Sequence, residues 1–176
     1  KYNVLSFNVL GGCHGSTGAT SRNPKTGEVY RASFPTITIR DMVNAEYAAL
    51  QALGIEEVQT VIGGSLGGMR TLEWGIMYPQ FMKQLIPLAV TPSLSAYGIA
   101  FNCIGLHAIE NDEDYANGQY TKATDVKGFE TARMAGMVTY RSDQLFNGRF
   151  ARKTAEGGHF EVESYLQHIG KKIGTH

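Results

Sequence analysis

A serine set between glycines is the stretch of this sequence best suited to chemistry. The β-type run 58–62 leads into Gly63, and Ser65 lies between Gly63 and Gly67, ahead of a segment of helical character. This is the G-x-S-x-G pattern of a nucleophile elbow, a sharp strand-to-helix turn that exposes the serine hydroxyl. Small neighbours are required because larger side chains would collide in so tight a turn. The pattern predicts a nucleophilic serine; the alternative is a glycine-rich turn in which Ser65 only caps a helix.

The residue after the serine supplies a second catalytic element. The backbone N–H of Leu66, at the start of the predicted helix, is the expected donor to the oxyanion of an acyl-transfer reaction. The other donor normally comes from a loop after an earlier strand, which we do not find in this sequence. A serine hydroxyl also needs a base, usually a histidine that is oriented by a carboxylate.

None of the five histidines is a convincing base for Ser65. In a hydrolase-type sheet the chain order is serine, then acid, then histidine at the end of a later strand, and no later strand is evident here. We interpret His107 as a core or lid residue of an apolar helix, and His159, in a glycine-rich loop, as the weak candidate. The others are interpreted as loop or surface residues: His14 (beside Cys13), His168 and His176. The catalytic Asp and His are therefore expected outside residues 1–176.

Composition limits the remaining function classes. Sixteen basic and sixteen acidic residues give zero net charge, which argues against a nucleic-acid partner or an anionic membrane surface. No apolar run approaches about 18 residues, so no membrane-spanning segment is expected. The two cysteines, Cys13 and Cys103, make no disulfide framework and favour a reducing cytoplasm. The acidic run 112–114 lacks calcium-loop spacing, and no nucleotide-binding glycine motif occurs, so neither a metal nor a tightly bound cofactor is predicted.

The first half of the chain alternates strands and helices. Strands are predicted at 2–9, 57–62 and 84–90, helices at 38–53 and 66–78, and a long glycine-rich loop at 11–33. Such alternation predicts a parallel sheet with right-handed crossovers, with Ser65 at the carboxyl end of its strand. Pro87 is expected at a strand end or a bulge, because proline cannot donate to a central ladder.

The second half has a different character, with helices predicted at 93–111, 127–141 and 160–169 and a polar turn at 111–118. No strand is evident after Val90. We therefore predict an α/β core over residues 1–91 and a helical lid or insertion over residues 92–176, covering the carboxyl edge of the sheet.

Four stretches together resemble one known family, the homoserine O-acetyltransferases of the α/β-hydrolase superfamily. They are NVLGGCHGSTG (8–18) with NPKTG (23–27), FPTITIRDMV (34–43), GGSLGGM (63–69) with LEW (72–74), and GFETAR (128–133) with MVTYRS (137–142). The segment FEVESYL (160–166) extends the likeness almost to the end of the chain. One departure is Leu66, where the family often has methionine, and it leaves the backbone N–H unaffected.

The resemblance implies an α/β-hydrolase fold, a mostly parallel sheet with a helical lid, of which this chain would be a partial domain. Family members also carry N-terminal strands and a C-terminal segment with the catalytic Asp and His. In the implied ping-pong reaction, Ser65 takes an acetyl group from the co-substrate acetyl-CoA and passes it to the hydroxyl of L-homoserine, for methionine biosynthesis. Arg133 matches a substrate-binding arginine of the family, and Tyr140 a tyrosine that lines the same site. A cytoplasmic homodimer is expected.

Several alternatives stay open at this point. The same fold could use succinyl-CoA as the donor or L-serine as the acceptor, it could be a serine esterase, or the chain could be a non-catalytic remnant. For the individual residues, a surface ion pair is the alternative role of Arg133, and packing within the lid is that of Tyr140.

Overall fold

The computed structural model describes residues 2–12, 15–122, 124–155 and 157–173. The chain divides into two compact units, residues 1–93 and 94–176. The sequence predicted a boundary between residues 91 and 92. The two units are described separately below.

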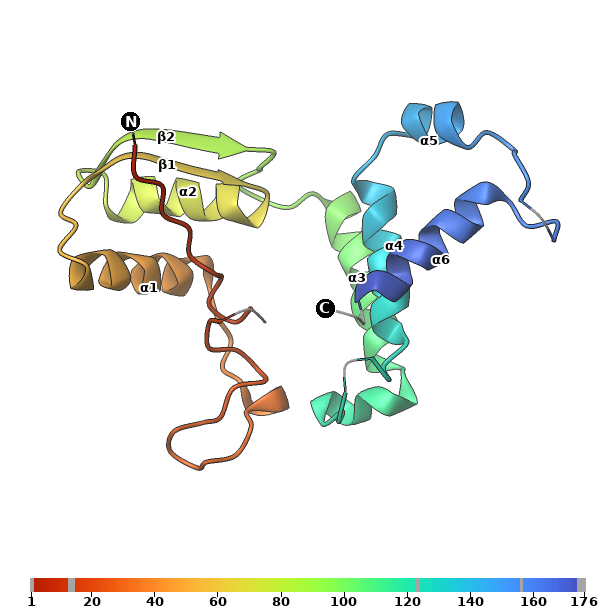
Figure 1. Ribbon diagram of the computed structural model, residues 1–176, viewed down its shortest axis with the longest axis horizontal. Coiled ribbons are helices and arrows are strands. Elements are labelled where there is room, and N and C mark those ends of the chain that lie inside the picture. Colours follow the sequence, from red (N-terminus) through yellow and green to blue (C-terminus); the bar gives the residue numbers. More distant parts are fainter. Residues whose placement is uncertain (1, 13–14, 123, 156, 174–176) are drawn as a thin grey trace. The chain divides into compact units, whose positions relative to one another are not determined.

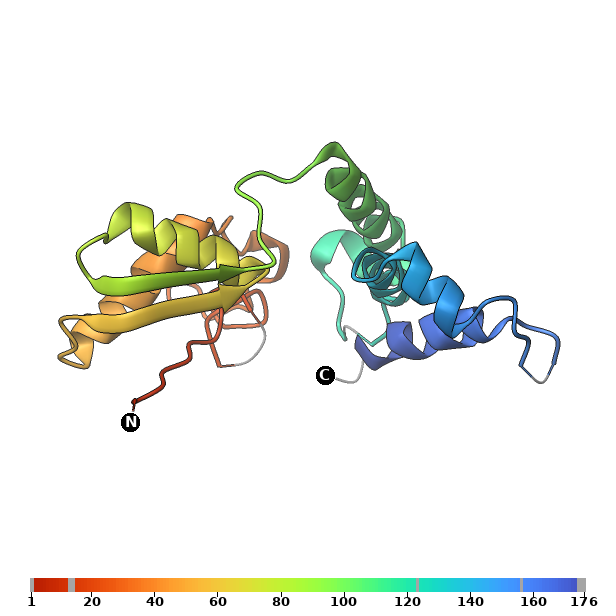
Figure 2. The ribbon, with the colours of Figure 1, turned by 90° about the horizontal axis from the view of Figure 1, so that it is seen from above.

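The first unit contains two strands, two α-helices and a short 3₁₀ turn. In chain order they are η1 (Arg31–Ser33), α1 (Ile39–Ala52), β1 (Val58–Gly64), α2 (Leu66–Met77) and β2 (Met82–Leu88). The strands pair in parallel, with Thr60 opposite Gln84 and Gly64 opposite Leu88, and Figure 2 shows them side by side and pointing the same way. Both predicted helices and two of the three predicted strands are thus confirmed, with ends shifted by one or two residues. Pro87 is the penultimate residue of β2, as its missing N–H requires.

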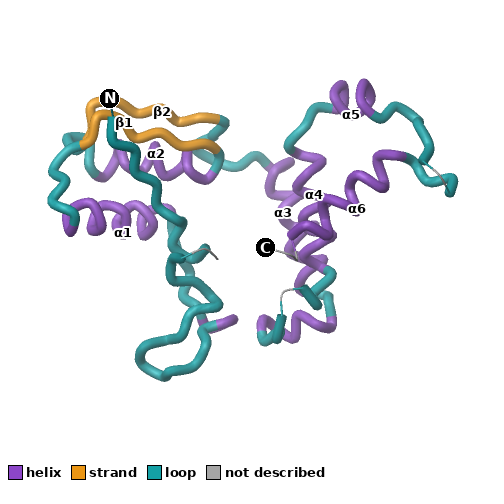
Figure 3. The backbone as a smooth tube through the Cα atoms, viewed as in Figure 1, coloured by secondary structure: helices purple, strands orange, loops and turns teal. Residues whose placement is uncertain are grey.

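The predicted strand at residues 2–9 is wrong. No strand forms in the described residues before β1, and residues 2–12 and 15–38 are almost entirely loop and turn (Figure 3). Tyr2, Val4 and Leu5 are 80%, 88% and 50% exposed, and of this segment Phe7 packs against the core. A run of β-type residues becomes a strand only where a neighbouring strand satisfies its backbone groups, and the described part of the chain places no strand beside residues 2–9.

Helix α1 begins at a capping box. The Thr38 hydroxyl accepts the N–H of Asp41 at 3.2 Å, while the Asp41 carboxylate accepts the N–H of Thr38 at 2.8 Å and its hydroxyl at 2.6 Å. These bonds satisfy backbone donors that a helix start leaves without intrahelical partners. The helix ends before Gly54, whose φ of 71° is favourable only for glycine. The predicted cap and stop are both confirmed.

The core of the first unit lies between the helices and one face of the sheet. Helix α2 packs on both strands and α1 packs on α2 (Figure 1). Buried apolar side chains of α1, α2, the connection after α2 and the start of β2 meet there: Val43, Leu50, Trp74, Phe81 and Met82. Partly buried Val58 and Val61 of β1 pack against them. Polar contacts also join the two helices. The Glu46 carboxylate of α1 forms an ion pair with Arg70 of α2 and accepts the indole N–H of Trp74 at 2.8 Å. The side chains of Glu46 and Arg70 are both largely buried, so this ion pair fixes α2 against α1.

The second unit is helical. Its elements are α3 (Ala96–Glu110), the 3₁₀ segment η2 (Glu113–Gly118), α4 (Gly128–Thr139), α5 (Asp143–Arg149) and α6 (Glu161–Ile173). Helix α4 packs against both α3 and α6. The expectation of helices without strands after Val90 is confirmed for the described residues, in which only one isolated bridge, Thr154 to Phe160, occurs. Helix α5 was not predicted; its sequence signals are the N-cap Ser142 and Arg149 in its last turn.

The capping box gives a pH-dependent contribution to stability. The hydrogen bonds from the Thr38 side chain and backbone hold the pKa of Asp41 below its ordinary value of 3.8. A lowered folded-state pKa stabilises the folded protein above the unfolded pKa, and this contribution is lost as pH falls through the lowered value. We expect Asp41→Asn to lower the melting temperature at pH 6–7, with a difference from the wild type that shrinks as pH falls below the ordinary carboxyl pKa and through the lowered one.

The control for this prediction is Glu56→Gln, which removes an exposed carboxylate that makes no hydrogen bond or ion pair in the described structure. It should leave the melting temperature unchanged at both pH values. A difference between Asp41→Asn and the wild type that stayed constant down to pH 2 would contradict the assignment.

Candidate active site

The turn between β1 and α2 holds Ser65 in a strained backbone conformation. Its φ is 55° and its ψ is −119°, a region that residues with a side chain rarely adopt. The Ser65 N–H donates to the carbonyl of Leu88 at 3.0 Å, and the Ser65 carbonyl accepts the N–H of Met69 at 3.0 Å. The end of β2 and the first turn of α2 therefore both fix the backbone of the serine, as the elbow pattern predicts.

Two glycines are required by close backbone approaches. A Cβ at Gly63 would overlap the carbonyl group of Gly67, so the chain can fold back on itself only if Gly63 has no side chain. A Cβ at Gly68 would lie 2.8 Å from the Val90 Cβ and 2.9 Å from the Leu88 carbonyl oxygen. The G-x-S-x-G pattern includes the first requirement but not the second, which arises from residues 20 and more positions further along the chain.

The side chain of Ser65 is free to react. Ser65 is exposed, and although it occupies the N-cap position its hydroxyl makes no capping hydrogen bond. The structure therefore does not support the alternative in which Ser65 only caps helix α2. Within the described residues the N–H of Leu66 has no hydrogen-bond acceptor either, and it lies at the positive end of α2. Such a donor can stabilise an oxyanion that forms at Ser65.

No described residue of the first unit is a histidine. His14 and its neighbour Cys13 lie outside the described residues, as does His176. The remaining three belong to the second unit and are exposed: His107, whose Nδ1 is 3.0 Å from the Asn111 amide nitrogen, His159, whose Nδ1 is 4.0 Å from a Glu163 oxygen, and His168. The described part of the first unit thus presents a nucleophile and an oxyanion donor but no histidine base.

Arg133 and Tyr140 lie together on the second unit. Arg133 is on α4 and Tyr140 caps its C-terminus, and the guanidinium carbon lies 5.6 Å from the centre of the Tyr140 ring. Among the described residues no carboxylate lies within 4.0 Å of Arg133, so the alternative of a surface ion pair is not observed. Tyr140 is 66% exposed, which also argues against a packing role. A half-buried guanidinium held over a ring and free of acid partners is suited to bind a carboxylate in bidentate fashion.

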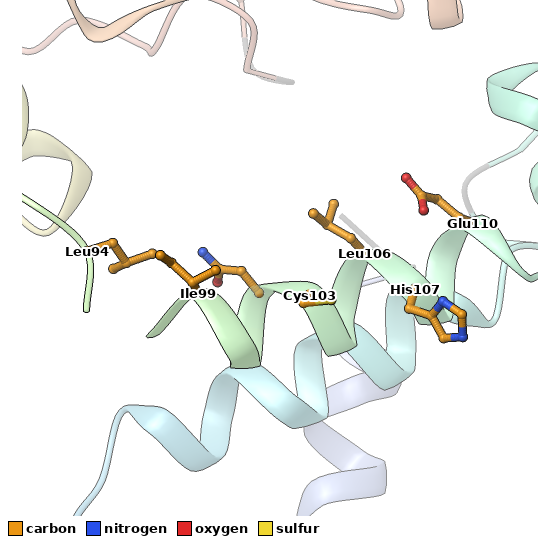
Figure 4. A pocket seen from close by; sticks show the side chains of 7 residues that line it. Leu94, Ile99, Cys103, Leu106, His107 and Glu110 are labelled. Carbon is orange, nitrogen blue, oxygen red and sulfur yellow. The ribbon is translucent and has the colours of Figure 1, made fainter. Parts of the chain in front are cut away.

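An open pocket of about 300 Å³ runs along α3. Figure 4 shows the side chains that line it, which include Leu94, Ile99, Cys103, Leu106 and His107. It includes neither the elbow residues nor Arg133 and Tyr140. Cys103 is an exposed free thiol, and the described residues contain no group of three potential metal ligands. None of the described helices is long and apolar enough to span a bilayer.

Comparisons with known proteins agree with the geometry of the elbow. The family model described as alpha/beta hydrolase fold matches residues 1–170. Curated relatives named homoserine O-acetyltransferase include one from Carboxydothermus hydrogenoformans, 43% identical over 98% of this chain and 48% of its own length. Another, from Trichormus variabilis, is 46% identical over 97% of this chain and 48% of its own length. The chain thus spans about half the length of the curated relatives it matches.

Solved structures show the same fold. The crystal structure of an esterase superposes with a TM-score of 0.81 at 25% identity, covering 95% of this chain and 50% of that one. The structure of homoserine O-acetyltransferase from Bacillus anthracis gives a TM-score of 0.82 at 22% identity, covering 90% of this chain and 44% of that one. At these identities the likeness concerns the fold, and it extends over both halves of the chain.

The glycine contacts predict a sharp difference between two neighbouring substitutions. Gly63→Ala should displace Gly67 and with it the first turn of α2, whereas Gly64→Ala adds a Cβ whose nearest neighbour is at an ordinary 3.9 Å. Because a shift of about 1 Å at a nucleophile can cost on the order of 100-fold in rate, the full-length protein with Gly63→Ala should lose roughly that factor in the release of 4-nitrophenol from 4-nitrophenyl acetate. Gly64→Ala is the matched control and should stay close to the wild-type rate; equal losses in both variants would contradict the assigned contact.

Proposed function

We propose that this chain, which belongs to the α/β hydrolase fold family, carries the nucleophile of a homoserine O-acetyltransferase. The observation that carries the proposal is Ser65, exposed at a strained elbow with the unpaired N–H of Leu66 beside it. The naming of curated relatives that match 97–98% of the chain supports the choice of substrates.

In the first half-reaction, the Ser65 Oγ attacks the thioester carbonyl of acetyl-CoA. A base outside the described residues removes the hydroxyl proton and returns it to the departing CoA thiolate, so that acetyl-serine and free CoA are formed. The Leu66 N–H donates to the oxyanion of the tetrahedral intermediate, at the positive end of α2. These steps require no metal and no tightly bound cofactor; acetyl-CoA is a co-substrate.

In the second half-reaction, the hydroxyl of L-homoserine attacks the acetyl-serine. The same base takes the proton of that hydroxyl and passes it to the Ser65 oxygen, which leaves as O-acetylhomoserine forms. Arg133 is the proposed partner of the substrate carboxylate, because its planar guanidinium offers two parallel N–H donors and the Tyr140 ring restricts its orientation. A cytoplasmic homodimer that acts in methionine biosynthesis completes the proposal.

A serine esterase is the competing function, and it differs only in the acceptor. The likeness to a solved esterase supports this alternative. The same acyl-serine is hydrolysed when water reaches it before the alcohol does. Succinyl-CoA as the donor and L-serine as the acceptor are further outcomes that one assay can distinguish.

The proposal is tested by following thiol release in the full-length protein that contains this chain. Acetyl-CoA and succinyl-CoA are each combined with homoserine, with serine, or with no acceptor. We expect thiol release that depends on acetyl-CoA and homoserine together, and at least a 1000-fold lower rate in Ser65→Ala, because the alanine offers no nucleophile. Equal release with and without an acceptor would establish an esterase instead, and full activity of Ser65→Ala would overturn the assignment of the nucleophile.

The role of Arg133 gives a separate prediction. Arg133→Ala should raise KM for homoserine about 10- to 100-fold, since a charge-assisted hydrogen-bond pair is lost, while KM for acetyl-CoA changes little. Arg133→Lys should recover only part of the loss, because an ammonium cannot form the bidentate pair. As a control, 3-amino-1-propanol lacks the carboxylate, so its rate should be the same in the wild type and both variants. If its rate fell in parallel with that of homoserine, Arg133 would have a structural role instead.

A further inference from the structure

Four cationic side chains gather around helix α5 of the second unit. Residues 141–153 contain Arg141, Arg149, Arg152 and Lys153 but only one carboxylate, Asp143, which gives this segment a net charge of +3 in a chain whose total is zero. All four cationic residues are exposed. The next charged residues along the chain are acidic, Glu156, Glu161 and Glu163, so the surplus belongs to residues 141–153 alone.

Aromatic rings hold three of the cations in place. The guanidinium carbons of Arg149 and Arg141 lie 5.0 and 6.0 Å from the centre of the same Tyr165 ring, and that of Arg152 lies 5.2 Å from the centre of the Phe160 ring. Tyr165 itself is set by contacts with Phe146 and Phe150, so the platform is formed by α5 and α6 together. Stacking of this kind restricts the guanidinium groups without using their N–H donors.

The N–H donors of these arginines are not engaged by acids. In the part of the chain that the structure describes, no carboxylate lies within 4.0 Å of Arg141, Arg149, Arg152 or Lys153. The first turn of α6 holds Glu161 and Glu163, and Glu163 accepts the N–H of Phe160 at 2.6 Å. Arg149 also lies in the last turn of α5, where a cation favours the helix dipole, but Arg141 and Arg152 lie outside that helix. Arg141 directly follows Tyr140, the C-cap of α4, and the Lys153 ammonium donates to the Arg149 carbonyl at 3.4 Å. Helix termini therefore account for three of the cations but not for Arg152.

We propose that Arg141, Arg149, Arg152 and Lys153 form a binding site for the phosphate groups of the CoA donor. This inference rests on the proposed function, and it assigns the recognition of the donor to residues separate from Ser65, Arg133 and Tyr140. The phosphates of CoA are far from the reacting thioester, so they offer binding energy that does not depend on the acyl group. Arginine is the side chain best suited to them, because its fork of donors matches two phosphate oxygens. Pre-stacked guanidinium groups lose less conformational freedom when the anion binds.

The test compares two acyl donors in the full-length protein. Acetyl-CoA carries the phosphates, whereas S-acetyl-N-acetylcysteamine presents the same thioester without any phosphate. In the double variant Arg149→Gln with Arg152→Gln we expect KM for acetyl-CoA to rise roughly 10-fold or more, with kcat little changed, and both constants for the truncated donor to stay at wild-type values. Lys122→Gln, which removes an exposed cation elsewhere in the same unit, is the matched control and should change nothing.

Two further measurements guard against a structural explanation. Arg152→Gln alone leaves the rings around Tyr165 intact and should still raise KM for acetyl-CoA several-fold. The dependence of that KM on NaCl concentration should also be weaker in this variant than in the wild type. An unchanged KM for acetyl-CoA, or equal increases for both donors, would overturn the inference. If the wild type transferred acetyl to homoserine from neither donor, the proposed function itself would fail, which is a different result.

Discussion

The backbone strain at Ser65 is the constraint that the surrounding elements of the first unit must hold in place. A non-glycine residue at φ 55° costs on the order of 1–3 kcal/mol, and such a conformation persists only where its surroundings hold it. Two hydrogen bonds do this directly, from Ser65 to Leu88 and from Met69 to Ser65. The close approach of Gly63 to Gly67 does it sterically, because the turn has no room to relax. In this strained conformation the Ser65 hydroxyl makes no capping hydrogen bond to α2 and stays exposed, as a nucleophile requires.

The position of the elbow in turn depends on how α2 is held. Trp74 and Val43 are 3% and 0% exposed, so the helix is anchored by the core that it shares with α1. The Glu46 carboxylate also fixes the orientation of α2. Because it binds both Arg70 and Trp74, it restricts rotation of that helix about its axis. The opposite face of the sheet is less covered: Ile62 and its partner Ile86 are 61% and 39% exposed. Since parallel sheets are normally covered on both faces, this apolar face is suited to further packing.

The features that could be predicted from sequence are those that local chemistry determines. The elbow, the capping box at Thr38 and the stop at Gly54 each follow from a few neighbouring residues, and all three are present. The failures depend on distant residues. Residues 2–9 have the composition of a strand but no strand beside them, and the need for glycine at position 68 arises from Leu88 and Val90. The convergence of Arg141 and Arg149 on Tyr165 likewise joins segments that sequence spacing does not connect.

The chemistry of the elbow does not by itself decide between a transferase and an esterase. An acyl-serine is an intermediate that either type of enzyme can form. A solved esterase and a solved homoserine O-acetyltransferase share this fold, with TM-scores of 0.81 and 0.82. What separates them is whether an alcohol reaches the acyl group before water does. An exposed Ser65 offers no such selection, so selection must come from residues that hold the acceptor and the donor. In the described part of the second unit, Arg133 beside Tyr140 and the arginines on Tyr165 and Phe160 have no carboxylate within 4.0 Å, and they are the residues that we propose for this selection.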